Sequence, residues 1–469
     1  MAEARRYRWS SVFRPKSWVG VTRHTTRLVL AHARWMGVGL IWHARALLRR
    51  SRVPPGRLTP GDGIRANQCR ILDGAGTHGP VLKVASDGLP VTYILGLARG
   101  RRFLTEHEDA TRGLTVDLTS LFPRGAVRGM EGEEHRTYRR LLLQALQSAP
   151  VEAHQENIDS AIDEALQAIA ATSDSGGADG PAIRQALRNG TSRIMMGLLY
   201  GLAPSDRLYA PMLDAFRRFG PREPIYQLTE QTSDAFRNLQ AIARERVDEI
   251  RRAPDESLPS MLRHLVLREQ LDETALGNLI NVFEASHYDT YSLWHWILWY
   301  LAREPDLRAR IRAMPPGSPE TTALLDAIVW ETLRLNQSES LLRGVKRDVT
   351  FDGYMIPGGS RVRVCLWESH KDPATFPDPF RFDPDRFLGK SYTLEEFAPF
   401  GLDKKRCIGA DFVVHLSACL VERMSREYDW EIVADGPPYR SVYHWQPSPD
   451  FAVRLRRRES KTVEVSRRA

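Results

Sequence analysis

One cysteine near the C-terminus lies in a loop whose residue types suit a reactive or metal-bound thiolate. Cys407 follows three consecutive cations in the loop from Phe400 to Gly409, which reads FGLDKKRCIG. A thiolate is stable at neutral pH only beside positive charge or on a metal. Residues 410–428 are predicted to form a helix, and the N-terminal end of a helix also favours an anion. The competing interpretation is a buried structural cysteine beside a solvated basic turn.

Further side chains with chemical potential lie on predicted helices. A helix opening at Glu133 carries His135 and Arg139 four residues apart, so they share one face. Together they could bind a carboxylate, or they could form a solvated basic face. A longer helix, 278–303, is apolar on nearly all sides and is therefore expected to be buried. Its middle is nonetheless polar, which indicates either an active-site wall or internally satisfied hydrogen bonds: Glu284, Ser286, His287, Asp289 and Thr290.

A second pair of charged residues is expected to support this region. Glu331 and Arg334 stand three apart on a predicted helix, 322–335, and can pair there. A non-helical stretch rich in Pro and Phe follows and ends in Asp385-Arg386-Phe387. Short strands are expected at 349–351 and 361–366. A hairpin is expected from strands 81–85 and 91–95, because a turn containing Asp87-Gly88 separates them.

Composition indicates a globular protein with an uneven charge. The net charge of the chain is +8, but residues 1–60 hold 13 Lys or Arg against one acid, Glu3, so the remainder is net negative. No basic and aromatic interleaving or nucleic-acid-binding motif is present, so no nucleic-acid partner is expected. The four cysteines are scattered without a CxxC pair, which argues against zinc and against a disulfide framework.

The basic N-terminal arm is predicted to contain an amphipathic helix over residues 28–48, ended by Pro54-Pro55-Gly56. Histidines and arginines interrupt its apolar run, so it does not fit a membrane-spanning helix. Residues 1–52 are expected to make peripheral contact with an anionic membrane surface, in a cytoplasmic protein with or without membrane association. Packing of this helix on the protein's own body, or an organelle transit peptide, are the alternatives.

Four separated signals, taken together, resemble the cytochrome P450 family. They are the polar-centred helix, the Glu331–Arg334 helix, the stretch ending at Phe387 and the cysteine loop. The resemblance covers roughly residues 65–455. It implies a mainly α fold with small β-sheets, in one catalytic domain over 61–469 after the 1–60 arm. It also implies haem b as the cofactor.

The same resemblance assigns roles to residues. Cys407 would be the thiolate ligand of the haem iron, which favours O–O bond cleavage. Phe400 would lie beside the haem in the cysteine loop. The haem propionates would be bound by His135, Arg139, Arg343 and Lys405. Glu331, Arg334 and Arg386 would form a buried structural ion network.

Two departures from the family pattern mark a divergent member. Asp403 and Lys405 stand where the family usually has glycine and Arg or His. On the long helix, counting back from Pro305 places Asp289 where the family has the alcohol of its acid–alcohol proton relay, with Tyr288 at the acid position. Thr290 falls one residue late, and a π-bulge would restore an Asp289–Thr290 pair. Asp289 and Thr290 are therefore the candidate catalytic residues.

The resemblance implies a haem-thiolate monooxygenase that oxidises a small, largely apolar organic molecule with O2. Electrons are expected from a separate ferredoxin or flavoprotein reductase that docks near the cations 404–406. One alternative is another haem-thiolate chemistry: peroxygenase, isomerase, dehydratase, or oxidative coupling or rearrangement. Another is a non-catalytic helper of a second enzyme. The substrate pocket is expected to draw on Phe283, Glu284, His287, Tyr288, Leu341 and Trp445.

Overall fold

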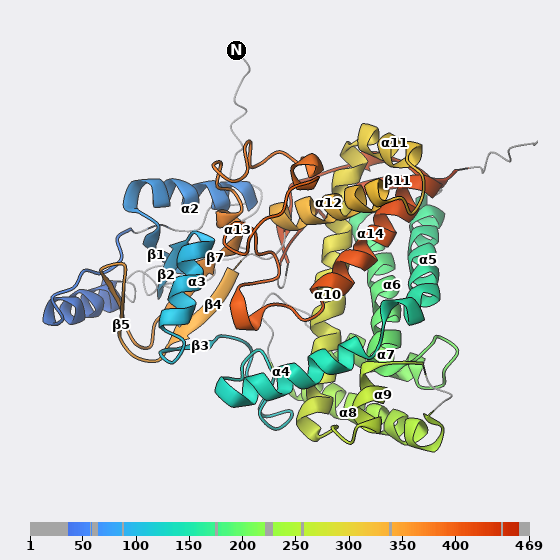
Figure 1. Ribbon diagram of the computed structural model, residues 1–469, viewed down its shortest axis with the longest axis horizontal. Coiled ribbons are helices and arrows are strands. Elements are labelled where there is room, and N and C mark those ends of the chain that lie inside the picture. Colours follow the sequence, from blue (N-terminus) through green and yellow to red (C-terminus); the bar gives the residue numbers. More distant parts are fainter. Residues whose placement is uncertain are drawn as a thin grey trace, which may run out of the picture.

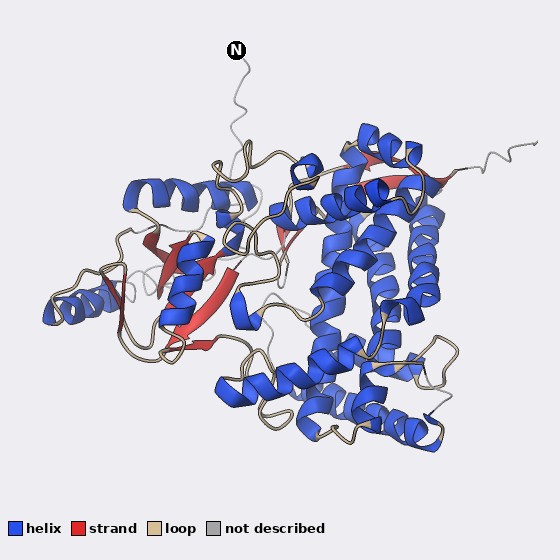
Figure 2. Cartoon of the chain, in the orientation of Figure 1, coloured by secondary structure: helices blue, strands red, loops and turns tan. Residues whose placement is uncertain are grey.

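The computed structural model describes residues 36–56, 58, 64–86, 89–173, 177–220, 228–254, 258–336, 340–441 and 444–458. Most of the predicted 1–60 arm lies outside these ranges. Within them the chain is mainly helical with small sheets, as predicted. Helices fill one side of the molecule, and strands gather mostly on the other (Figure 2).

The helical side is built around α10, Glu273–Arg303, which runs through its middle (Figure 1). Asp272 caps this helix, because its Oδ1 accepts from the amide of Ala275 at 2.7 Å. The apolar residues that predicted a buried helix do pack on all sides, and the helix begins five residues before the predicted start at 278. The helices against it are α6 (Gly180–Tyr200), α8 (Glu230–Arg252), α9 (Met261–Leu267), α11 (Pro305–Ala313), α12 (Pro319–Asn336) and α14 (Ala410–Glu427).

The remaining helices extend this bundle or cover the sheet. They are α2 (Ile64–His78), α3 (Leu97–Glu106), α4 (Gly132–Gln147), η1 (Val151–His154), α5 (Gln155–Ser173), α7 (Tyr209–Phe219), α13 (Leu366–Ser369), η3 (Pro384–Phe387) and η4 (Asp403–Lys405). Figure 1 shows α4 crossing the bundle below α10. One apolar core joins residues of α4 through α14, so the bundle is a single packed unit.

The main sheet has five strands in the order β1-β2-β7-β4-β3. The predicted hairpin is confirmed as β1 (Val81–Ser86) against β2 (Leu89–Leu95). β2 pairs in parallel with β7 (Arg361–Cys365), whereas β4 (Ser340–Val345) pairs antiparallel with β7 and with β3 (Thr111–Gly113). The small sheets contain β5 (Val349–Phe351), β6 (Tyr354–Ile356), β8 (Tyr428–Ala434), β9 (Tyr439–Arg440), β10 (Trp445–Gln446) and β11 (Ala452–Arg457).

The described part of the N-terminal arm contains a helix, residues 36–48, that packs beside the β5–β6 hairpin. Trp42 is buried on it, Arg45 pairs with Asp348, and the amide of Met355 donates to the carbonyl of Arg52 at 2.7 Å. Its opposite face exposes large apolar side chains: Met36, Leu40, Ile41, Leu47 and Leu48. Among the described helices, none has the length and apolarity needed to cross a bilayer.

Candidate active site

The cysteine loop is closed by its own backbone. The amide of Cys407 donates to the carbonyl of Phe400 at 2.9 Å, and Gly401 has φ near +90°. The left-handed conformation that favours glycine is therefore needed at Gly401. Position 403 instead begins the η4 turn, Asp403–Lys405, with right-handed backbone. This explains why the loop can hold an aspartate where the family has a glycine.

The Cys407 thiol faces an enclosed space. Its side chain is solvent-accessible, yet burial among protein atoms raises the pKa of the thiol. These two facts agree only if the sulfur lines an internal gap, because a thiol in open solvent would not be desolvated. The amide of Gly409, just before α14, opposes that rise, as do the cations Arg128 and Arg139. The loop can thus stabilise an anionic sulfur once a cofactor fills the gap.

One face of α10 is open to the same gap. Its half-buried residues recur at the spacing of a single helix face, namely Asn281, Val282, Ala285, Ser286 and Asp289. Asp289 keeps 48% of its side chain exposed, on a helix that is otherwise packed. Its carboxylate also raises the pKa of the Cys407 thiol, which places the two groups within electrostatic range of each other. Asp289 and Cys407 therefore face one space from two different elements.

Thr290 does not share this open face. Its side chain is buried, and its hydroxyl donates to the carbonyl of Ser286 at 2.7 Å. α10 is a continuous α-helix from Glu273 to Arg303, so it does not contain the π-bulge that would pair Thr290 with Asp289. One residue turns an α-helix by about 100°, which carries Thr290 into the packed side. The prediction that Thr290 lies at the cavity is corrected, and Asp289 remains there alone.

Asp289 has a partner far away in sequence. The Nε2–H of His444, just before β10, donates to Oδ1 of Asp289 at 2.9 Å. Two more bonds tie α10 to this turn: the Tyr288 hydroxyl donates to Ser441 Oγ at 3.0 Å, and Trp296 Nε1 donates to the carbonyl of Trp445 at 2.9 Å. Tyr288 and Trp445 therefore both lie beside the segment that contacts Asp289. His444 is a further candidate residue, and its contact with Asp289 could not be predicted from helical spacing, because His444 is not on α10.

A cluster of cations lies beside the cysteine loop. Burial, with Lys405 and Arg139, lowers the pKa of His135 to about 4. Burial, with Arg343, lowers the pKa of Lys405 to about 8. The pKa of Arg343 is lowered by burial and by Arg128, which belongs to the loop before α4 and was not predicted. The structure therefore brings His135, Arg139, Arg343 and Lys405 together, and their mutual repulsion indicates a site for anions.

Lys405 is oriented by the loop before α4. Its Nζ donates to the carbonyls of Arg128 at 3.1 Å and Met130 at 2.6 Å. Gly113 leaves room for this arrangement, since a Cβ there would fall 2.8 Å from the carbonyl oxygen of Arg128. Lys405 is thus held inward rather than free on the surface, and Lys404 pairs with Glu108 at 2.7 Å. Two of the three cations expected to meet an electron donor are therefore already engaged.

The structure also brings Glu331, Arg334 and Arg386 together. Arg334 binds both carboxylate oxygens of Glu331, at 2.6 and 2.7 Å, and both side chains have 0% exposure. Arg386 donates to Glu331 Oε1 at 3.2 Å. Arg334 also donates to the backbone carbonyls of residues 370, 379 and 381. This network connects α12 to the stretch that leads to the cysteine loop.

Three residues predicted for the substrate pocket lie on another face of α10. Phe283 stacks on Phe216 of α7 with ring centroids 3.7 Å apart, and Glu284 lies beside Gly220. Phe283 and His287 line a separate cavity of about 240 Å³ between α6, α7 and α10. The prediction missed this because the helix repeat separates these residues from Asp289 by more than a quarter turn. Leu341, on β4, packs within the core of the sheet.

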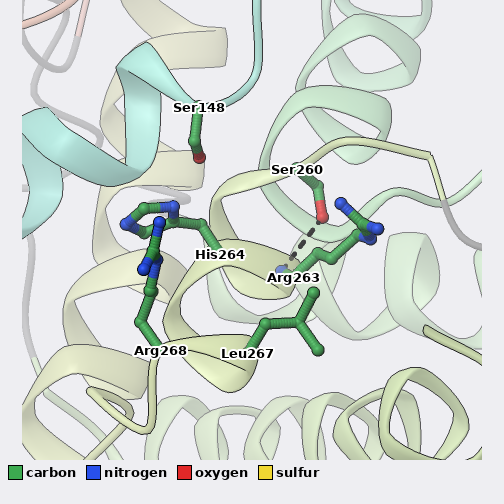
Figure 3. A pocket seen from close by; sticks show the side chains of 6 residues that line it. All are labelled: Ser148, Ser260, Arg263, His264, Leu267 and Arg268. Carbon is green, nitrogen blue, oxygen red and sulfur yellow. Dashed lines mark hydrogen bonds between the residues drawn. The ribbon is translucent and has the colours of Figure 1, made fainter. Parts of the chain in front are cut away.

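A further cavity of about 190 Å³ lies between the end of α4 and α9. Figure 3 shows His264 and Arg268 side by side on one wall, with Ser148 across from them. None of its lining residues belongs to the groups around Cys407. It is therefore not part of the candidate active site.

An accessible thiol in a cationic loop, opposite a carboxylate on a long buried helix, defines the site of a thiolate-ligated cofactor. The sequence model of the Cytochrome P450 family matches residues 71–445 of the chain. The chain therefore belongs to the cytochrome P450 family, whose cofactor is protoporphyrin IX haem.

Known relatives and solved structures agree with this membership. The chain is 35% identical over 174 residues to 25-hydroxyvitamin D-1 alpha hydroxylase, mitochondrial, of Mus musculus, and 32% over 160 residues to ent-kaurenoic acid oxidase 1 of Hordeum vulgare. These alignments span 33% and 31% of this chain and 34% and 32% of the relatives. A retinoic acid-bound cyanobacterial CYP120A1 matches 87% of this chain and 100% of its own, with TM-score 0.66 and 22% identity. A zebra fish cytochrome P450 with progesterone matches 83% and 99%, with TM-score 0.68 and 18% identity.

The residues present fit a haem. Its iron needs one soft ligand, which the accessible Cys407 sulfur supplies. Its two propionates need positive partners, and burial together with neighbouring cations lowers the pKa values of Arg139, Arg343 and Lys405, as expected where an anion is to be bound. The gap faced by both Cys407 and Asp289 gives the group a place between α10 and the cysteine loop.

Proposed function

We propose that the protein is a haem-thiolate monooxygenase that oxidises a small, largely apolar organic molecule with O2 and electrons from a separate redox partner. The observation that carries this proposal is an accessible Cys407 thiol within electrostatic range of Asp289, which lies on the open face of α10. The hydroxylase and oxidase among the relatives support the reaction type. The apolar members of the open face, Val282 and Ala285, support an apolar substrate.

Each part of the site has a distinct task in this proposal. Haem, when bound, supplies the activation of O2, and thiolate ligation favours cleavage of the O–O bond. The cysteine loop holds the sulfur in place through the Cys407–Phe400 backbone bond. Arg139, Arg343 and Lys405 neutralise carboxylates at the rim of the gap. Asp289, on the other side, is placed to hold a proton where oxygen chemistry would need one.

A reduced-CO difference spectrum tests the thiolate assignment. The wild-type protein is expected to show the red-shifted Soret band that thiolate ligation gives, and Cys407→Ser is expected to lose it. Cys69→Ser is the matched control, because Cys69 is a half-buried thiol on α2 outside the site. A red-shifted band that survives in Cys407→Ser would refute the assignment.

A peroxide-driven reaction is the second candidate, and the placement of Thr290 favours it. The alcohol predicted to serve O2 activation is turned into the packed side of α10, whereas a carboxylate faces the gap. A carboxylate there can act as general acid or base on peroxide. Turnover that needs a reductant and O2 supports the monooxygenase. Turnover with hydrogen peroxide alone supports a peroxygenase, and turnover with neither supports an isomerase or dehydratase.

The electron donor is proposed to be a ferredoxin or flavoprotein reductase, in line with the redox partners that cytochromes P450 use. Because Lys404 and Lys405 are engaged, the exposed Arg140 on α4 is the better candidate for a docking cation. Exchange of Arg140 for Glu is expected to slow electron transfer without changing the CO spectrum. The exposed apolar face of helix 36–48 is proposed to make the peripheral membrane contact.

A further inference from the structure

The contact between Asp289 and His444 is built by several independent bonds. Oδ1 of Asp289 and Nε2 of His444 are 2.9 Å apart, and the His444 side chain is only 17% exposed. The amide of Ser441 donates to the carbonyl of His444 at 3.0 Å, and Ser441 Oγ in turn accepts from Tyr288. The turn is therefore fixed to α10 next to Asp289. His444 reaches Asp289 because both ends of the contact are anchored.

The hydroxyls of Thr290 and Ser286, near Asp289 on α10, do not make an equivalent contact with another element. Thr290 is buried with its hydroxyl on the carbonyl of Ser286. Ser286 does lie on the open face, but its hydroxyl donates to the carbonyl of Phe283 at 3.3 Å. Both hydroxyls therefore donate to backbone carbonyls of α10 itself. Asp289, by contrast, is an open-face residue whose side chain bonds to another element, at His444.

A carboxylate and an imidazole at this distance can share one proton. The proton can reside on Nε2 and be donated to Oδ1, or reside on Oδ1 and be donated to Nε2. Either state keeps a proton at the carboxyl that faces the gap. The imidazole also fixes the orientation of the carboxyl, as histidine–carboxylate pairs do in other acid–base sites.

We propose that Asp289 and His444 form the proton-delivering pair of this protein, with Asp289 facing the haem side and His444 acting through it as a positioning residue. This inference rests on the proposed haem-thiolate function. The relay predicted from the sequence ran between Asp289 and Thr290 on one helix, whereas the proposed relay runs between α10 and the turn before β10.

The proposal accounts for the protons that the reaction consumes. Monooxygenation of one C–H bond to C–OH uses one O2, two electrons and two protons, and the second oxygen atom leaves as water. The redox partner supplies the electrons. The carboxyl of Asp289 gives up the shared proton toward the gap, once for each of the two protons that the reaction consumes. Solvent returns a proton to the imidazole, so the pair ends each cycle unchanged.

The test measures coupling, defined as product formed per electron consumed, in the haem-loaded full-length protein with its electron donor. Asp289→Asn is expected to lower the rate of product formation by about 10²-fold and to release the lost electrons as peroxide. His444→Phe is expected to show the same defect with KM unchanged, and His444→Gln, which keeps a donor, is expected to recover part of the rate. Thr290→Val is expected to retain the wild-type coupling.

A second readout does not depend on turnover. The C–O stretching frequency of the ferrous carbonyl form reports the polar groups on the Asp289 side of the gap. Asp289→Asn and His444→Phe are expected to shift this band in the same direction, and the double variant is expected to shift it no further. Asp326→Asn is the matched charge control, because Asp326 on α12 also has a nearby histidine, His415, but does not face the gap. It is expected to leave the band in place.

The failures of the two proposals are distinguishable. If the wild-type protein lacks the thiolate CO signature, the proposed function fails. If that signature is present but both Asp289→Asn and His444→Phe keep wild-type coupling and carbonyl band, the paired relay is wrong. A loss of coupling in Thr290→Val that matches the loss in Asp289→Asn would also overturn it, because the relay would then run through the threonine.

Discussion

Glu284 and His287 lie one helical turn apart on the packed face of α10, with Oε2 of Glu284 4.0 Å from Nδ1 of His287. The two side chains are not hydrogen-bonded to each other, because Nδ1 of His287 contacts the carbonyl oxygen of Phe283 at 3.1 Å. Burial raises the pKa of Glu284 to about 7 and lowers the pKa of His287 to about 4. Near neutral pH His287 is therefore uncharged, whereas Glu284 is near the midpoint of its titration. Among the residues that the structure describes, none forms a hydrogen bond with the carboxyl oxygens of Glu284.

This relationship predicts a stability that depends on pH. A carboxyl whose pKa is raised on folding stabilises the folded state below its unfolded value, here 4.5, and that stabilisation is lost as pH rises through about 7. Glu284→Gln stays neutral. It is expected to match the wild-type free energy of unfolding near about pH 5 and to exceed it by up to about 3 kcal/mol near about pH 8. Urea unfolding at the two pH values measures this difference.

Two points make the comparison of wild type with Glu284→Gln specific to the Glu284 carboxyl. His287 titrates in both proteins, so its own contribution largely cancels from the difference. Glu156→Gln, an exposed position on α5, is the control and is expected to change stability by less than about 0.5 kcal/mol at either pH. A difference between wild type and Glu284→Gln that is the same at both pH values would contradict the buried-carboxyl interpretation.

The Glu331–Arg334 pair predicts a large cost for a conservative exchange. Arg334→Lys loses the two-point contact with Glu331 and several bonds to backbone carbonyls in a fully buried site. The expected loss is about 3–5 kcal/mol of unfolding free energy, because a buried carboxylate is left poorly paired. Arg386→Lys loses a single 3.2 Å contact with Glu331 and bonds to the carbonyls of Pro377 and Asp378. It is expected to cost less, because Glu331 keeps its two-point contact with Arg334, and it replaces Arg334→Lys in the experiment if that variant does not fold. Arg207→Lys, in an exposed pair with Glu245, should cost below about 1 kcal/mol.

The cation cluster predicts which residues retain haem. Arg139 lies inward on α4 and interacts electrostatically with Cys407, whereas Arg136 on the same helix is exposed and pairs with Glu133. Arg139→Gln is expected to raise the rate of haem loss to a haem-scavenging protein by about tenfold, the loss of one charge-assisted contact. Arg136→Gln is the matched control. Equal rates for the two variants would argue that Arg139 does not bind the cofactor.

The N-terminal helix predicts binding to anionic vesicles. Leu47 and Leu48 are 77% and 86% exposed and stand next to Arg49 and Arg50. Exchange of both leucines for serine is expected to weaken flotation with phosphatidylserine-containing vesicles by at least about tenfold, since each leucine forfeits its burial in lipid. Thermal stability should not change, because neither side chain packs on the body. Leu258→Ser, 41% exposed elsewhere, tests whether any exposed leucine has this effect.

Local patterns in the sequence predicted the elements of this fold well. The apolar run around residues 278–303 sufficed for α10, because a helix that is apolar on all sides can only be buried. The strand-forming residues on both sides of the turn at Asp87-Gly88 were enough to predict the β1–β2 pair. The spacing of Glu331 and Arg334 placed both on one helical turn, and Arg386, which the family resemblance assigned to the same network, contacts Glu331 in the structure.

The orientation of side chains in the site was harder to predict. Thr290 and Phe283 differ from Asp289 by one and six positions, and only the packing of α6 and α7 decides which face of α10 turns to the gap. His444 and Arg128 reach the site from loops, and a loop has no periodic pattern from which the direction of a side chain can be predicted. Their contacts join segments distant in sequence, and such contacts depend on the whole fold rather than on local propensity.

The parallel pairing of β2 with β7 has a consequence for how the protein is made. Val91 lies beside Arg361, so the β1–β2 hairpin leaves the ribosome long before the strand that completes its sheet. Pairings between distant segments form late, and the open edge of β2 is exposed meanwhile. Cys407 is synthesised later still. Haem can therefore be captured only after residue 407 has been synthesised, and a shortage of haem would leave that chain with the site beside Cys407 unfilled.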